Sequence, residues 1–258
     1  MTDMVFTDTH THLYDEAFSG EEDQAIARAV EAGVTRLVFP DIDSKSRDSM
    51  FALADRHPGT VFPCIGLHPT SVDSGWRSEI EKMEQYLDRN AVAIGETGMD
   101  CYWSKEYVEE QKAALEYQIV LAHRKGLPVI IHSREATGPI FDVLDRCRHL
   151  DMRGVFHAFS GSIETFRRLQ KYGDWYVGIG GVATYKKASI AETLKEILLG
   201  RILLETDSPY LTPVPKRGTR NESSYIPYIA EKVAGLKGTD IEEVAAVTTE
   251  NARQLFNI

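Results

Sequence analysis

Hydrophobic residues gather in eight short runs along the chain, and the runs are rich in β-branched or aromatic side chains. Their apolar character is continuous rather than alternating, which is typical of strands buried on both faces of a parallel sheet. Pro63 does not fit this pattern, because proline cannot donate to a sheet ladder. The predicted strands cover residues 5–8, 35–39, 61–66, 91–95, 128–131, 154–156, 175–179 and 201–204.

Segments with helical periodicity separate these strands. In the longest, Leu115, Ile119 and Ala122 recur at helical spacing, and Gly126 is a natural stop. The predicted helices cover residues 24–32, 108–125, 163–172 and 190–199, and two more, over 225–234 and 240–256, follow the last strand.

Eight strands that alternate with helices match the repeat of a (β/α)8 barrel. We therefore predict an α/β fold, a TIM-type barrel with additional C-terminal helices, as a single domain over residues 1–258. A doubly wound open sheet is the alternative that the pattern alone leaves open.

Composition narrows the class of protein. The chain is 43% hydrophobic and 26% charged, which excludes a disordered or collagen-like chain. A net charge of -10 disfavours a broadly cationic nucleic-acid binder but leaves room for a local basic patch. We expect a cytoplasmic protein without a membrane partner, because the chain lacks a long apolar segment and a signal peptide, and its three cysteines are far apart. Its oligomeric state is not predicted.

Histidines and carboxylates concentrate directly after the predicted strands, where TIM barrels carry their chemistry. His10 and His12 share one face of a strand, and Glu96 emerges from a buried run where an unpaired charge is unfavourable. Imidazoles and carboxylates are ligands of zinc, manganese and magnesium. The alternatives are surface histidines, satisfied core histidines and a carboxylate paired with arginine. The candidate metal ligands are His10, His12, Glu96, His132, His157 and Asp207.

Other polar residues at these ends are candidates for supporting roles. Glu205 is expected to orient a ligand, while His68 and Arg134 are candidate substrate-binding residues for a phosphate. The alternative for Arg134 is a structural salt bridge. A basic rim (Lys186, Lys187, Lys216, Arg217 and Arg220) and three aromatic side chains that would stack bases (Tyr102, Trp103 and Tyr210) are alternatively ordinary surface or core residues.

Six segments together resemble one protein family. They read HTH, GLHP, GETGMD, HSREA, HAFSG and ETDSPYL, at residues 10–12, 66–69, 95–100, 132–136, 157–161 and 205–211. In this order they resemble the TatD-like metal-dependent deoxyribonucleases of the amidohydrolase superfamily. The chain departs from the common pattern at Thr97, Met99, Ala158 and Ser223, none of which is a proposed ligand.

The resemblance implies two divalent metal ions and hydrolysis of DNA phosphodiester bonds, from single-stranded ends, by a metal-activated water. Asp207 is the candidate proton acceptor and, with Glu96, the candidate catalytic residue. It also implies which residues hold each ion: His10, His12, Glu96 and Asp207 for the first, and Glu96, His132 and His157 for the second. The metal is magnesium, manganese or zinc.

Two other functions stay open at this point. The first is an amide, lactone or phosphate-ester hydrolase that uses the same binuclear site, because the ligands set the reaction type while the loops set the substrate. The second is a metal-binding interaction protein, which the complete ligand set disfavours.

Overall fold

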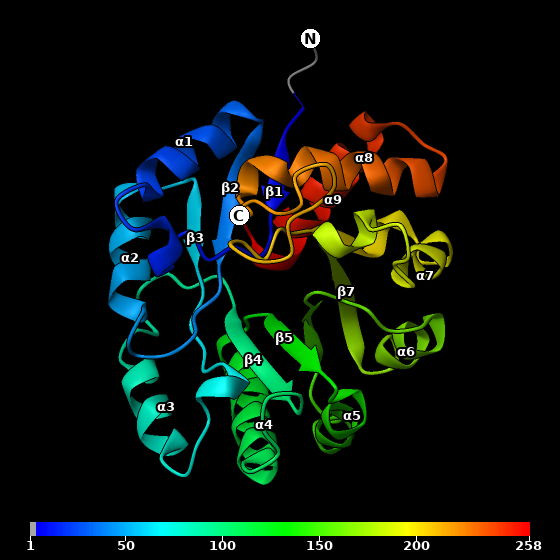
Figure 1. Cartoon of the computed structure of the whole chain (residues 1–258). Helices are drawn as coiled ribbons and strands as arrows, with labels where there is room; N and C mark the ends of the chain where they lie inside the picture. Colours follow the sequence, from blue (N-terminus) through cyan, green and yellow to red (C-terminus); the bar gives the residue numbers. More distant parts are fainter. Residues whose placement is uncertain (1–3) are drawn as a thin grey trace.

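The computed structural model describes residues 4–258, which form the predicted TIM-type barrel (Figure 1). The first three residues, part of the N-terminal segment considered above, lie outside the described residues. All eight predicted strands are present and pair in parallel. They are β1 (Phe6–Asp8), β2 (Val34–Phe39), β3 (Val61–Pro63), β4 (Ile94–Asp100), β5 (Val129–Arg134), β6 (Met152–Phe156), β7 (Gly173–Ile179) and β8 (Ile202–Leu204).

The strands form two ladders, β1–β3 and β4–β8, and short contacts join the ladders into a ring. At one seam, Ile65 pairs with Ile94 in a parallel bridge just beyond the end of β3. At the other seam, Thr11 pairs with Ser208, and the amide of Thr9 donates to the carbonyl of Leu204 at 2.9 Å. Pro63 is the last residue of β3, next to the first seam, where a missing donor interrupts little of the ladder.

The helices surround the ring of strands, as Figure 1 shows. They are α1 (Glu22–Glu31), α2 (Arg47–Arg56), α3 (Trp76–Glu84), α4 (Val108–Lys125), α5 (Thr137–Arg146), α6 (Ile163–Leu169), α7 (Ile190–Glu196), α8 (Ile226–Lys237) and α9 (Ile241–Phe256). Short 3-10 turns lie at Glu16–Phe18, Pro69–Ser71, Gly181–Thr184, Leu199–Arg201 and Ser223–Tyr225.

Alternate residues in or beside strands β2 to β8 serve two separate cores, which explains why these apolar runs are continuous. One set, including Leu37, Ile131 and Val177, packs outward against the helices. The other set fills the barrel interior and comes from or beside β2 to β8: Val38, Cys64, Ala93, Ile130, Val155, Tyr176 and Leu203.

The C-terminal helix α9 closes the interior from the amino ends of the strands. Leu255 and Phe256 belong to the interior cluster. Farther up the helix, Thr249 donates to the carbonyl of Val5 before β1, and Asn251 donates to that of Ile202 at the start of β8. The carboxyl ends of the strands, where the candidate ligands were predicted, therefore lie at the opposite, open end. We call this end the mouth and the α9 end the floor.

Local chemistry explains where the pattern was right and wrong. Asp240 caps α9 by accepting from the amide of Glu243 at 2.7 Å. The helices α2, α3 and α5 lie where no helix was predicted, and α5 begins Thr137-Gly138-Pro139, which suggests a loop. The strands β4 and β5 run farther than predicted, so that Glu96 and His132 lie within strands rather than after them.

Across residues 4–258, no helix combines the length and apolar character that crossing a membrane requires.

Candidate metal centre

Glu96 is the centre of a buried polar cluster at the mouth. Its side chain is 2% exposed, and its two carboxylate oxygens face different groups of imidazoles. Oε2 lies 3.0 Å from Nε2 of His10, while Oε1 lies 2.8 Å from Nδ1 of His132. A carboxylate with this arrangement can be shared between two cations.

The first group of donors comes from the segments that follow β1 and β8, which adjoin at the seam. Nε2 of His10 and Nε2 of His12 lie 3.2 Å apart, and Oδ1 of Asp207 is 3.8 and 3.6 Å from them. The amide of Asp207 donates to the carbonyl of His10 at 2.8 Å, so the two loops hold each other in place. With Glu96, these are the four residues expected to hold the first ion.

The second group of expected ligands is His132, in β5, and His157, directly after β6. Nε2 of His157 lies 3.5 Å from Oε1 of Glu96, and its ring stacks on His10 at a centroid distance of 3.6 Å. Nε2 of His68 is also 3.5 Å from Oε1 of Glu96. The structure therefore places His68, which the sequence suggested as a substrate contact, beside the candidate ligands themselves.

The electrostatics of the cluster follow from burial opposed by close partners. Burial raises the pKa of Glu96, but His10, His157 and His68 outweigh burial and hold that pKa well below its usual value. Burial lowers the pKa of His157, and Glu205, Glu96 and Asp207 more than reverse this, to about 10. Hydrogen bonds to Asp100 and Glu96 likewise overcome burial and raise the pKa of His132 to about 8. A cation that binds here must displace such protons.

Glu205 lies beside His157 at the end of β8. Its Oε1 lies 3.2 Å from Nδ1 of His157 and accepts from the amide of Ala158. This leaves Nε2 of His157 turned toward Glu96. The carboxylate rests against Gly178 of β7, where a Cβ atom would overlap it, so this position requires glycine.

Two further supporting residues were missed by sequence reasoning. Nδ1 of His12 lies 2.9 Å from the hydroxyl of Tyr14, which donates to the carbonyl of Pro40. The hydroxyl therefore accepts from Nδ1–H, which leaves the lone pair of His12 on Nε2. Oδ2 of Asp100 lies 3.1 Å from Nε2 of His132. Tyr14 lies close to His12 in the sequence and Asp100 lies close to Glu96, but closeness in sequence does not show which side chains form hydrogen bonds.

A buried ion pair supports the strands behind Glu96. Nε of Arg47 donates to Oδ2 of Asp41 at 2.6 Å, and both side chains are essentially inaccessible. The same Oδ2 accepts from the amide of Gly66, while the backbone carbonyl of Asp41 accepts from the amide of Glu96. The pair thus connects the ends of β2, β3 and β4.

Arg134 lies at the exposed rim of a cleft of about 950 Å³ that opens over the cluster. Its guanidinium carbon stands 4.0 Å from the ring centre of Tyr102 and 5.2 Å from that of Trp103. Trp103 is 70% exposed and Tyr210 is 58% exposed, so neither ring is a core residue. Among the described residues, Arg134 therefore stacks on aromatic rings and does not form the structural salt bridge that was its alternative.

Not all cations of the predicted basic rim are free of carboxylate partners. Arg220 donates to Glu21 at 2.7 Å and to the carbonyl of Ala17, so its charge is neutralised. Arg217 instead stands 4.3 Å from the ring centre of Tyr185, and Lys186 and Lys187 are exposed.

The donor set fits divalent cations. The ligand atoms of His10, His12 and Glu96 lie within 4.8 Å of one another, and so do those of His68, Glu96 and His132. Within residues 4–258, the side chains that approach the Glu96 carboxylate are imidazoles, so no lysine or arginine takes the place of a cation. Mixed nitrogen and oxygen donors of this kind suit zinc or manganese, and also admit magnesium.

Comparison with known proteins agrees with this geometry. The family model described as TatD related DNase matches residues 7–257. The uncharacterized metal-dependent hydrolase YabD of Bacillus subtilis (strain 168) is 38% identical, over 99% of this chain and 100% of that protein. The 3'-5' ssDNA/RNA exonuclease TatD of Erwinia tasmaniensis is 32% identical, over 97% and 99%. The crystal structure of the TatD homologue YjjV from Escherichia coli K12 matches with a TM-score of 0.91 and 30% identity, over 100% of both chains. The chain therefore belongs to the TatD-related DNase family of metal-dependent hydrolases.

Proposed function

We propose that this protein is a phosphodiesterase that removes nucleotides from single-stranded DNA ends with two divalent cations. The observation that carries the proposal is the Glu96 carboxylate, whose two oxygens face two different groups of donors. His10, His12, Glu96 and Asp207 would hold one cation, and Glu96, His132 and His157 the other. When bound, such a pair activates water and neutralises charge on the phosphoryl and leaving oxygens.

The chain's own residues supply orientation and proton transfer. Oδ1 of Asp207, 3.6 Å from Nε2 of His12, is the proposed proton acceptor for the attacking water. Glu205 and Tyr14 hold the rings of His157 and His12 so that Nε2 of each is directed into the cluster. His68 at the cluster and Arg134 at the cleft rim are the proposed donors to phosphate oxygens.

The choice of substrate is supported by a relative. The Erwinia tasmaniensis protein, 32% identical over nearly its whole length, is named a 3'-5' ssDNA/RNA exonuclease. We therefore propose single-stranded nucleic acid as the class of substrate for this chain too.

The test is hydrolysis of an end-labelled single-stranded oligonucleotide by protein loaded with magnesium, manganese or zinc. The matched variants are Glu96→Gln, at the centre of the cluster, and Glu250→Gln, the same change at a side chain of α9 that is 46% exposed. We expect Glu96→Gln to reduce kcat/KM about a thousandfold, because loss of a shared ligand removes several kcal/mol of transition-state stabilisation. Glu250→Gln should match the native protein.

Three results would contradict the proposal. Native protein that releases no nucleotide with any of these metals is not such a nuclease, and hydrolysis of a carboxylic ester or lactone instead would support the alternative hydrolase. Equal cleavage by Glu96→Gln and native protein would show that the activity lies elsewhere. Less than about one bound metal per chain would exclude a binuclear site.

A further inference from the structure

Two adjoining loops on one side of the mouth carry four cations, which we call the basic flank: Lys186, Lys187, Lys216 and Arg217. The loops follow β7 and β8 and are joined by hydrogen bonds. The amide of Val214 donates to Thr184 Oγ1 at 2.8 Å, and the Tyr185 hydroxyl donates to the carbonyl of Thr212 at 3.0 Å. The flank is therefore one surface built from both loops.

Two cations of the basic flank contact aromatic rings rather than carboxylates. Nζ of Lys216 stands 5.7 and 5.9 Å from the ring centres of Tyr225 and Tyr228, and Arg217 covers the ring of Tyr185. Within residues 4–258 none of the four forms an ion pair, whereas Arg220 on the same loop is paired with Glu21. On a chain with a net charge of -10, this is an uncompensated positive surface.

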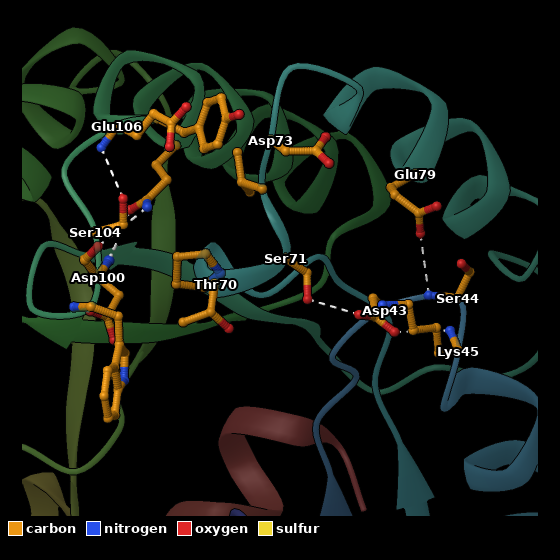
Figure 2. Close-up of a pocket in the computed structure, with 15 residues that line it drawn as sticks. Asp43, Ser44, Lys45, Thr70, Ser71, Asp73, Glu79, Asp100, Ser104 and Glu106 are labelled. Carbon is orange, nitrogen blue, oxygen red and sulfur yellow. Dashed lines mark hydrogen bonds between the residues drawn. The ribbon is translucent and has the colours of Figure 1, made fainter.

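The opposite side of the mouth has the reverse charge. A second cavity of about 480 Å³ adjoins the main cleft there, between the loops that follow β2, β3 and β4 (Figure 2). Among the described residues that line this cavity, one is a cation, Lys45. Five are carboxylates: Asp43, Asp73, Glu79, Asp100 and Glu106. A phosphate chain is repelled by this cavity and attracted by the basic flank.

A continuous stretch of chain leads from the metal centre to the basic flank. It begins at Asp207 and passes Tyr210 and Leu211, which line the main cleft and are 58% and 40% exposed. The carbonyl of Leu211 packs so closely on Gly181 that a Cβ atom there would overlap it, which fixes one loop against the other. An exposed ring followed by cations is the combination that binds single-stranded nucleic acid.

We propose that the polynucleotide substrate, beyond the bond that is cleaved, extends past Tyr210 over the basic flank and away from the acidic cavity. This inference rests on the proposed nuclease function and adds the route of the bound strand to it. Contacts between its phosphates and the flank make hydrolysis dependent on strand length and on salt, because each contact releases counterions.

The test compares two variants that each replace four cations by glutamine. The flank variant carries Lys186→Gln, Lys187→Gln, Lys216→Gln and Arg217→Gln. The control variant carries the same change in charge on exposed residues near the floor: Arg124→Gln, Lys125→Gln, Arg148→Gln and Lys171→Gln. Each metal-loaded protein is assayed over a range of KCl on oligothymidylate of about 16 nucleotides, on dinucleotides and on bis(p-nitrophenyl) phosphate.

For the flank variant we expect KM for the oligonucleotide to rise about tenfold or more. The negative slope of log kcat/KM against log salt should become shallower by up to about 3. Hydrolysis of bis(p-nitrophenyl) phosphate should stay native in both variants, which also reports intact folding. Native protein should show a lower KM for the oligonucleotide than for the dinucleotide. Equal KM values for those two substrates, or equal behaviour of the two variants on the oligonucleotide, would overturn the route. Failure of native protein on all phosphodiesters would instead overturn the proposed function.

Discussion

The buried side chains at the mouth and at the floor of this barrel differ in chemical character. At the floor, Val155 and Leu203 are at most 1% exposed and share a cluster with Leu255 of α9. At the mouth, His10 and Glu96 are equally buried, at 0% and 2%, but they are titratable. Burial of apolar groups stabilises the fold, whereas burial of charges destabilises it unless they are paired.

The difference shows how a barrel tolerates a buried cluster of titratable side chains. The floor supplies hydrophobic stabilisation that owes nothing to a ligand, while the mouth holds carboxylates whose partners are imidazoles rather than fixed cations. We therefore expect substitutions at the floor to change the free energy of unfolding and leave the chemistry intact. Substitutions that disturb the supports at the mouth should do the reverse.

The largest expected effect is at the floor. Leu255→Ala removes a side chain that is 2% exposed and should lower the free energy of unfolding by about 3 kcal/mol, as for other core truncations. Urea denaturation measures this, and kcat below the transition should remain native. Leu198→Ala, the same change on a side chain that is 76% exposed, is the control and should have little effect. A loss of kcat in folded Leu255→Ala would contradict the division between the two ends.

Gly178→Ala should produce the reverse pattern at the mouth. The new methyl group overlaps the Glu205 carboxylate and displaces it from His157, so kcat/KM should fall by about 10- to 100-fold. Metal titration should show a larger dissociation constant. Gly138→Ala is the control, since a methyl group on that helical residue meets open space. Native metal affinity in Gly178→Ala would show that Glu205 does not orient His157.

The two ends were not equally predictable from the sequence. All eight strands and the closing helix α9 follow from apolar runs and a helical period, because those patterns reflect burial directly. The candidate ligands were chosen from their place after the predicted strands, although Glu96 and His132 lie within β4 and β5. Tyr14 and Asp100 were missed because a supporting contact depends on side-chain direction across the mouth, which spacing along one strand does not determine. Arg220 was assigned to the rim because its partner Glu21 is 199 residues away in sequence.

Tyr14→Phe sharpens the comparison with a smaller change. It removes one oxygen, the acceptor for Nδ1–H of His12, while the ring still fills its place against Phe39. We expect about a tenfold weaker metal affinity and a similar loss of kcat/KM, with little change in unfolding. Tyr117→Phe removes a hydroxyl that donates to Glu84 on the outer surface and should behave as native protein. Equal metal affinity in the two variants would exclude a positioning role for Tyr14.

The smallest effect concerns a charge at the floor that is solvated rather than buried. Hydrogen bonds from Arg253 and Gln254 lower the pKa of Glu250 on α9 from 4.5 to about 2. Because the folded pKa lies below the unfolded one, this contribution to stability is present above about pH 4.5 and is lost as the pH falls toward 2. Glu250→Gln should therefore be slightly less stable than native protein at pH 7, with a difference that shrinks in acid and in high salt. Urea denaturation from pH 7 to 3 measures this difference. A deficit as large as that of Leu255→Ala would mean that this charge stabilises the floor as much as apolar packing does. A deficit that grows as the pH falls would show that the Glu250 charge is not its source.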